Sequence, residues 1–245
     1  SSNTAIASVP ASVTVTQNGK HATFTVTTYS VASAQSVTIT AKTGSASATT
    51  SLTVNPGSLA SISTSPTSIV GGDYPTGTVT LTVPAPAGGT VVSLSSNNAL
   101  ITLPATVTVP AGSKSTTFSV PTLGVDSNTS VTLTATLGAT SKTCTVTLLP
   151  AAIYTVTLSS ASVVGGHTVT GTANLNGDAG PSGVVVTLSS SDTTSATVPA
   201  SATVTQNGKH ASFTVTTYPV ATAQTVTITA TAGGKSATVT LTVNP

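Results

Sequence analysis

Residues Thr14–Val26 read Thr-Val-Thr-Gln-Asn-Gly-Lys-His-Ala-Thr-Phe-Thr-Val. Nearly the same stretch returns as Thr203–Val215, and a weaker version occupies Thr108–Val120. In each copy apolar residues alternate with hydroxyl residues, which is the pattern of a β-strand with one buried face. The three copies therefore predict an all-β chain built from repeats.

The Asn-Gly pair at the centre of the stretch predicts a β-hairpin, because a type I′ turn needs positive φ at both central residues. A two-residue loop at Asn18-Gly19 would pair Val15 with Ala22 and Val13 with Phe24. The apolar side chains would then share one face of an antiparallel sheet, and the threonines would share the other.

The phenylalanines mark the length of the repeat, since Phe24, Phe118 and Phe213 follow one another at nearly equal spacing. The first and third copies are the most alike: Pro10–Pro56 and Pro199–Pro245 are identical at 36 of 47 positions, without a gap. Pro10 thus corresponds to Pro199, and this constant shift in numbering is called here the duplication offset. Near-identity at two periods indicates that a pair of domains was duplicated as a unit, which implies a longer array.

These periods divide the chain into three predicted domains, called here repeat 1 (residues 1–56), repeat 2 (57–150) and repeat 3 (151–245). Repeat 3 is complete, and its alternating runs predict seven or eight strands in roughly 95 residues, as expected for an immunoglobulin-like β-sandwich. A bend at Val163–Gly166 is expected to carry the chain from one sheet to the other. The short junctions at Asn55-Pro56-Gly57 and Leu149-Pro150-Ala151 favour a semi-rigid rod of domains. The other expected strands of repeat 3 are Ile153–Leu158, His167–Leu175, Gly183–Leu188, Ser195–Val198, the two arms of the Asn207-Gly208 hairpin, Thr225–Ala230 and Ala237–Val243.

Repeat 1 is incomplete, because Ser1–Thr4 aligns with Ser190–Thr193 and roughly the first 39 residues of a repeat are missing. The missing residues would form about three strands. We therefore expect an open sheet edge and an uncovered apolar face, which favour association. Two explanations stand: the chain is a piece of a longer protein, or another subunit supplies the missing strands. The residues of this possible assembly face are Val13, Val15, Phe24 and Val26.

Several motifs of the chain resemble those of bacterial immunoglobulin-like (Ig-like) repeat domains, which occur in tandem on surface proteins, adhesins, filament subunits and the spacer regions of secreted enzymes. The resemblance extends over all three repeats. It implies tandem Ig-like sandwiches and an extracellular or cell-surface location, and it brings no shared catalytic residues. In repeat 3 the motifs are Ser162–Gly166, Thr168–Thr172, Val186–Ser190, Val198–Ser201 and Phe213–Thr217.

The composition argues against several classes of partner. Charged residues make up 4% of the chain, compared with about 25% in ordinary soluble domains. Six scattered lysines and four aspartates give a net charge of +2, so we expect neither nucleic-acid binding nor a polybasic membrane patch. No apolar run reaches the roughly 18 residues of a membrane helix, so no membrane insertion is expected. The single cysteine, Cys144, is in phase with Val146 and Leu148 and is expected to be a small buried apolar residue.

The titratable residues form no recognisable catalytic or metal-binding pattern. The four aspartates, Asp73, Asp126, Asp178 and Asp192, occupy positions that no two repeats share. His21 and His210 lie beside their turns without further ligands at metal-binding spacing. We therefore expect no enzyme activity, no cofactor and no metal. Lysines at the equivalent positions 20, 114 and 209 are expected to be solvated turn residues.

Two classes of function remain. In the first, the chain is a structural segment of an extracellular bacterial filament or surface-protein stalk, its partners are copies of itself, and strand complementation holds subunits together. In the second, it is an adhesin or accessory module that binds polysaccharide, ice or a host surface, with glycans as partners. A passive spacer in a secreted enzyme is a further alternative.

Overall fold

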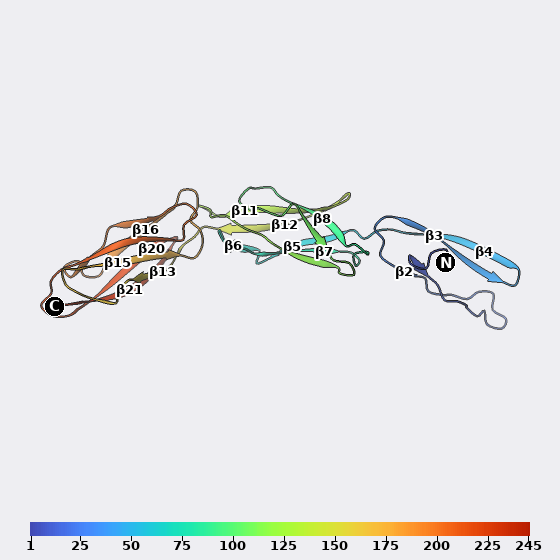
Figure 1. The fold of residues 1–245 in the computed structure, drawn as a ribbon, viewed down its shortest axis with the longest axis horizontal. Helices are drawn as coiled ribbons and strands as arrows, with labels where there is room; N and C mark the ends of the chain where they lie inside the picture. The colour runs from blue at the N-terminus through green and yellow to red at the C-terminus, as the bar shows by residue number, and fades with distance from the viewer.

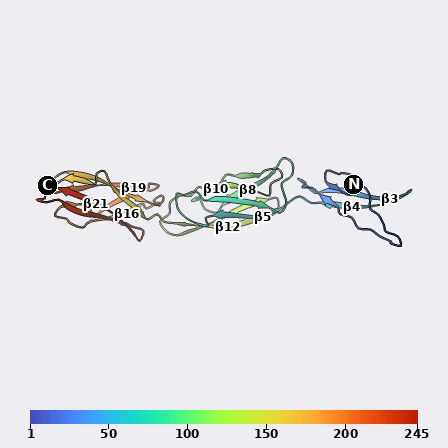
Figure 2. The same ribbon diagram turned by 90° about the horizontal axis from the view of Figure 1, so that it is seen from below.

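The computed structural model describes all residues, 1–245, and contains strands, turns and loops only. Figure 1 shows three lobes in a row, with the N-terminus in one end lobe and the C-terminus in the other. Figure 2 shows the same row after a quarter turn, so the molecule is elongated in both views. The chain is all-β, and its complete lobes are Ig-like sandwiches arranged in tandem.

Repeat 3 consists of a four-stranded and a five-stranded sheet, with 19 buried residues packed between them. The alternating sequence explains this layering: in β20, Val226, Ile228 and Ala230 are buried, and the threonines between them face outward. The four-stranded sheet has the order β13 (Ile153–Leu158), β15 (Thr168–Leu175), β19 (His210–Thr217) and β17 (Ala196–Thr197). The five-stranded sheet has the order β14 (Ser162–Val164), β21 (Lys235–Asn244), β20 (Gln224–Ala232), β16 (Val184–Ser190) and β18 (Ser201–Val204).

Repeat 2 follows the same plan around a cluster of 17 buried residues. The smaller sheet has three strands, in the order β10 (Ser115–Ser119), β7 (Thr76–Leu81) and β5 (Leu59–Ser65). The larger sheet has five strands, in the order β6 (Ser68–Val70), β12 (Thr140–Leu149), β11 (Thr129–Leu137), β8 (Thr90–Ser96) and β9 (Thr106–Val109).

Repeat 1 has only two separate pairs of strands. The short strands β1 (Ala7–Ser8) and β2 (Thr27–Thr28) form one pair, and the long strands β3 (Gln35–Thr43) and β4 (Ala46–Val54) form the other. Its buried cluster contains three residues, compared with 17 and 19 in the complete repeats. The structure thus confirms tandem sandwiches of which the first is incomplete.

The predicted Asn-Gly hairpin is wrong. In repeat 3, β18 pairs with β16 in one sheet, and β19 pairs with β15 and β17 in the other. The turn at Asn207-Gly208 therefore connects the two sheets of the sandwich rather than two neighbouring strands. In repeat 1 the residues on either side of Asn18-Gly19 form no ladder, so the predicted pairs Val15–Ala22 and Val13–Phe24 do not exist.

The geometry of the turn explains the error. Only Asn207 has a positive φ, of 60°, and the N–H of Gly208 donates to the carbonyl of Thr205 at 2.9 Å. Positive φ at the third turn residue alone is the signature of a type II turn, whereas a type I′ hairpin needs two such residues in succession. The turn is held from outside by the backbone of Ala179, which accepts from the N–H of Asn207 and donates to the carbonyl of Gly208.

The expected change of sheets at Val163–Gly166 is confirmed. Gly165 and Gly166 turn the chain from β14, in the five-stranded sheet, into β15, in the four-stranded sheet. An earlier change, from β13 to β14 at residues 159–161, was not expected. Gly166 has a φ of +94°, which explains why a glycine stands there.

A phenylalanine stacked on a glycine joins two strands in each complete repeat. Phe213 of β19 is the direct partner of Gly171 in β15, and Phe118 of β10 is the partner of Gly77 in β7. A Cβ on either glycine would overlap the ring of its phenylalanine. The missing glycine side chain therefore makes the space in which the ring lies against the neighbouring strand.

We predict that Gly171→Ala lowers the stability of repeat 3 by about 1–2 kcal/mol, because overlap with the Phe213 ring outweighs the smaller entropy loss of alanine. Hydrogen exchange of the buried β20 amides measures this stability. Ser212→Ala, at an exposed position next to Phe213, is the control and should cost less than about 0.5 kcal/mol. Equal effects of the two substitutions would contradict the stacking argument.

Candidate functional site

Repeat 1 retains the arrangement of the second half of a repeat. The N–H of Ser2 donates to the carbonyl of Thr38, and the hydroxyl of Ser2 accepts from the N–H of Thr38, both at 2.9 Å. Ser191 and Thr227 make the same two bonds in repeat 3, again at 2.9 Å. The two pairs are related by the duplication offset, which supports the alignment of Ser1–Thr4 with Ser190–Thr193.

The equivalence shows which strand repeat 1 lacks. In repeat 3, β16 lies between β18 and β20: Val184 and Val186 pair with Val204 and Ala202 on one side, and Leu188 pairs with Ala230 on the other. Under the duplication offset, the segments of repeat 1 that would flank a strand like β16 are Ser12–Val15 and Ile39–Lys42. Neither segment pairs with a strand on that side in repeat 1.

A groove lies at this place. It has a volume of about 650 Å³, and a smaller hollow of about 190 Å³ that includes Phe24 adjoins it. We call both together the strand slot. The lining residues of the larger part are Val13, Thr14, Val15, Ala41, Lys42, Thr43, Ala46, Ser47 and Ala48.

The apolar side chains predicted to form an assembly face behave in two ways. Val13, Val15 and Phe24 are 47%, 49% and 43% exposed, whereas Val204 and Phe213, the counterparts of Val15 and Phe24, are 0% and 6% exposed. Phe24 has no glycine-bearing strand on which to stack. Val26 is different, because it packs against the small cluster of Ala7, Val37 and Ile39. Because these three side chains are already about half buried, burying the rest would contribute roughly 0.7–1.5 kcal/mol each, half of the value for a fully exposed side chain.

Sequence reasoning missed the half of the strand slot that β3 and β4 supply. Ala41–Thr43 and Ala46–Ala48 are wholly exposed, and their small side chains form one wall of the groove. Their counterparts in repeat 3 begin at Ala230, which contacts Leu188 across the ladder. Applying the duplication offset to Ala41 as well as to the Asn18-Gly19 turn would have identified this wall, because the counterpart of Ala41 is Ala230.

The titratable groups are not brought together into a reactive site. No three histidine, cysteine or acidic side chains are close enough to hold a metal ion. Lys209 lies with its Nζ 3.6 Å from an oxygen of Asp178, in a partly exposed ion pair. Cys144 was expected to be buried but is only partly so: it packs at the edge of the repeat 2 core, and burial raises the pKa of its thiol. No helix of the structure is long and apolar enough to span a membrane.

The Asp192 carboxylate accepts hydrogen bonds from residues of its own loop. Hydrogen bonds from Ser195 and Thr194 lower its pKa to about 2. Asn3 and Asn98 occupy the equivalent positions and accept from the backbone two residues later, as Asp192 does. Asp192 therefore stabilises a loop turn and shows no feature of a catalytic acid.

The sequence matches no family model, and no curated protein is similar to it. The structure resembles that of the adhesin InvE of Yersinia pseudotuberculosis, with 19% identity and a TM-score of 0.34 over 77% of this chain and 61% of InvE. It also resembles FdeC, an adhesin of Escherichia coli (14% identity, TM-score 0.34, 86% of this chain and 74% of FdeC). A third similar structure is the I67–I69 fragment of titin (12% identity, TM-score 0.33, 86% and 74%).

These structural neighbours are bacterial adhesins and titin domain tandems. The chain spans less than two thirds of the InvE structure. Identities of 12–19% and TM-scores of 0.33–0.34 indicate a likeness of fold alone.

We predict that the Asp192 carboxyl titrates with a midpoint near pH 2 in the folded protein, compared with about 3.9 in an unfolded chain. Because the folded pKa is the lower one, Asp192 stabilises the fold above pH 4 and loses this effect as the pH falls through about 2. Carboxyl-carbon NMR measures the midpoint. Ser195→Ala should raise it, since Ser195 makes the largest contribution, and an unchanged midpoint in that variant would contradict the assignment.

Proposed function

We propose that this chain is a non-catalytic structural segment of an extracellular bacterial filament or surface-protein stalk. Three domains lie end to end in a row, joined by short proline-containing junctions, and together form a rod (Figure 1). The strand slot of repeat 1 provides the contact that would hold neighbouring units together. Charge contributes little, because only ten residues of the chain are lysine or aspartate.

The occupant of the strand slot in this proposal is the first half of a repeat of the same kind, supplied by a neighbouring molecule. A strand with the pattern of Val184–Ser190 would pair with Ser12–Val15 and with Ile39–Lys42 in the register that β16 uses in repeat 3. Main-chain hydrogen bonds and alternate apolar side chains would be satisfied together. A second strand with the pattern of β15 would bring the glycine on which Phe24 stacks.

The observation that carries the proposal is the match between the strand slot and β16. Each flanking segment matches its counterpart in repeat 3 at three of four positions, with Val13 in place of Ala202 and Lys42 in place of Thr231. The space between the two segments is open and lined mainly by valine and alanine side chains. Such a contact joins two different surfaces and is therefore heterologous, and a heterologous contact whose rotation does not close into a ring propagates along a fibre.

Electron microscopy of the native material tests the filament. We expect ordered filaments in which a neighbouring molecule fills the strand slot of each repeat 1.

Val13→Asp together with Val15→Asp should abolish assembly, because the charges would face the apolar side of the incoming strand. Val185→Asp on β16 is the matched control, since Val185 is 61% exposed on the outer face of repeat 3. Single rods, or filaments that persist in the double variant, would refute the proposal.

A fusion tests the occupant directly. Placing a copy of residues 151–189 ahead of Ser1 would rebuild a complete repeat, because Ser1 is the counterpart of Ser190. We expect the amides of residues 22–26 to exchange at least about 100-fold more slowly in the fusion than in the original chain. The amides of β19 in repeat 3 are the internal reference. Unchanged exchange would show that the strand slot does not accept this segment.

Robust binding of the chain to a polysaccharide, to ice or to a host surface, with no filaments in the native material, would favour the adhesin alternative instead.

A further inference from the structure

The contact between repeats 2 and 3 is unusually close for two domains joined by a short linker. Val70, at the end of β6 in repeat 2, packs against the hydrophobic cluster of repeat 3. Gly177 lies opposite, and a Cβ there would overlap the Val70 side chain. The two domains therefore share apolar packing beyond the linker residues Leu149–Ala151.

The backbones of the two repeats also meet. The N–H of Asp178 in repeat 3 donates to the carbonyl of Gly71 in repeat 2 at 2.8 Å. A Cβ on Gly72 would overlap the carboxyl group of Asp178, and a Cβ on Gly124 would lie 2.5 Å from the carbonyl oxygens of Asp178 and Ala179. Glycines on repeat 2 thus permit the approach of the Asp178 loop.

A carboxylate of repeat 2 also accepts hydrogen bonds from repeat 3. Asp126 of repeat 2 accepts from the N–H of Ser182, at 3.2 Å to each carboxylate oxygen, and from the Ser182 hydroxyl at 2.8 Å. A Cβ on Gly180 would overlap the Asp126 carboxylate. Bonds to an ionised acceptor are stronger than neutral ones and have a defined direction.

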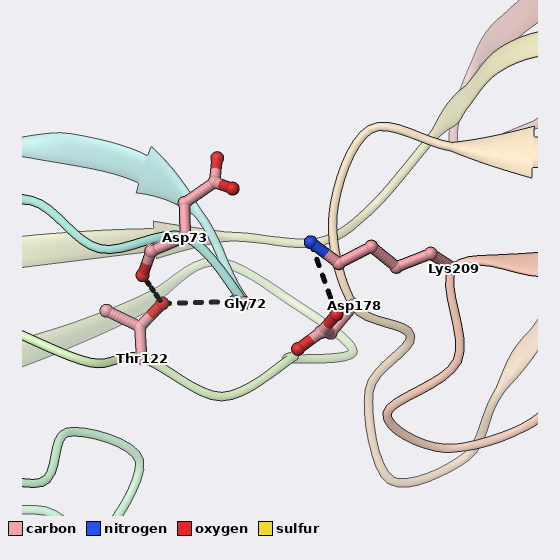
Figure 3. Close-up of polar contacts among 5 residues, drawn as sticks. All are labelled: Gly72, Asp73, Thr122, Asp178 and Lys209. Atoms are coloured by element: carbon pink, nitrogen blue, oxygen red, sulfur yellow. Dashed lines mark hydrogen bonds and ion pairs between the residues drawn. The ribbon is translucent and has the colours of Figure 1, made fainter.

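Figure 3 shows how the repeat 2 surface is braced. The Thr122 hydroxyl accepts from the N–H of Gly72 at 3.0 Å and donates to the carbonyl of Asp73 at 2.7 Å. On the other side, Asp178 lies in its ion pair with Lys209. The Asp73 carboxylate lies at the same end of repeat 2 but points away from Thr122 and Asp178, so it takes no part in the contact (Figure 3).

The other repeats lack the residues that make this contact. The counterparts of Gly124 and Asp126 are Ser30 and Ala32 in repeat 1, and Pro219 and Ala221 in repeat 3. The residues of repeat 2 that correspond to Gly177, Asp178, Gly180 and Ser182 are Val83, Pro84, Pro86 and Gly88.

The junction between repeats 1 and 2 is accordingly different. A cleft of about 480 Å³ opens there, and Val31, Ala32, Pro84 and Pro86 are among its lining residues. No hydrogen bond joins residues 1–55 to residues 57–150. The same end-to-end arrangement of domains is therefore loose at one junction and tightly fitted at the other.

We propose that the loops of repeat 2 that face repeat 3, and the loop of repeat 3 that meets them, form a rigid joint. This joint selects which kind of domain can precede which along the chain. Its partner surfaces are a Gly-Gly turn with Gly124 and Asp126 on one domain, and the Gly177–Ser182 loop on the next. Only a domain of the repeat 2 kind fits ahead of a domain of the repeat 3 kind. A domain ending like repeat 3 is excluded, because Pro219 would place its ring where Gly124 meets the two carbonyls. The joint makes repeats 2 and 3 one stiff unit, whatever fills the strand slot.

Spin-label distance measurements on the full chain test this joint. Labels attached through Thr145→Cys and Thr238→Cys occupy equivalent exposed positions on β12 and β21, and Cys144→Ala removes the native thiol. Alanine stands at the position of Cys144 in the other two repeats, as Ala48 and Ala237, so the background is expected to fold. We expect a single narrow distance distribution for the unaltered joint.

The decisive variant is Gly124→Ser with Asp126→Ala, which gives repeat 2 the residues that repeat 1 has at these positions, Ser30 and Ala32. It should widen the distribution at least about twofold, because domains without a fitted interface move relative to each other. Asp73→Ala is the matched control and should leave the width unchanged, since its carboxylate contacts neither repeat 3 nor Thr122 (Figure 3). Unchanged hydrogen exchange within repeat 2 shows that the variant is folded. A broad distribution in the unaltered joint, or no widening in the variant, would overturn the proposal.

Discussion

The sheets of the two complete repeats are mainly apolar on the face that is buried and mainly hydroxyl-bearing on the other, and this asymmetry determines how the chain packs. Valine, isoleucine and leucine alternate with threonine and serine along the strands, so one face of each sheet must be covered by another. Charge offers no substitute, because charged residues are 4% of the chain and the structure contains one ion pair. A second sheet is the only cover that the repeats provide, and burial of the shared face is the dominant stabilising force.

For the same reason, repeat 1 is the part of the chain that exposes apolar side chains which the complete repeats bury. Its strands β3 and β4 present the face that β20 and β21 bury in repeat 3, but no strand lies beside β3 at the position that β16 occupies in repeat 3. Val15 and Phe24 consequently remain exposed where their counterparts Val204 and Phe213 are buried. Unpaired backbone groups beside exposed apolar side chains are the features that strand addition uses, and the proposed contact between molecules rests on them.

Between the domains, a different constraint applies. Loops at the ends of sandwiches are polar and variable, so two domains meet closely only where side chains are absent or complementary. Repeats 2 and 3 satisfy both conditions through glycines and through the Asp126–Ser182 contact, and repeats 1 and 2 satisfy neither. A rod built by alternating such junctions would be stiff within each pair of domains and would bend between pairs.

Much of this could be predicted from the sequence by itself. The period of the phenylalanines, the alternation of apolar and hydroxyl residues and the duplication offset determine tandem sandwiches, most strands of repeat 3 and the open face of repeat 1. These features are local or repeated, so one strand reveals its pattern without its neighbours. The choice of neighbours was decided by the tertiary structure. The Asn207-Gly208 turn carries a hairpin signal, yet β18 and β19 join different sheets, because each finds its partners among β15, β16 and β17. Likewise, nothing local shows that Asp126 meets Ser182, far along the chain, since that contact exists only when two complete domains lie end to end.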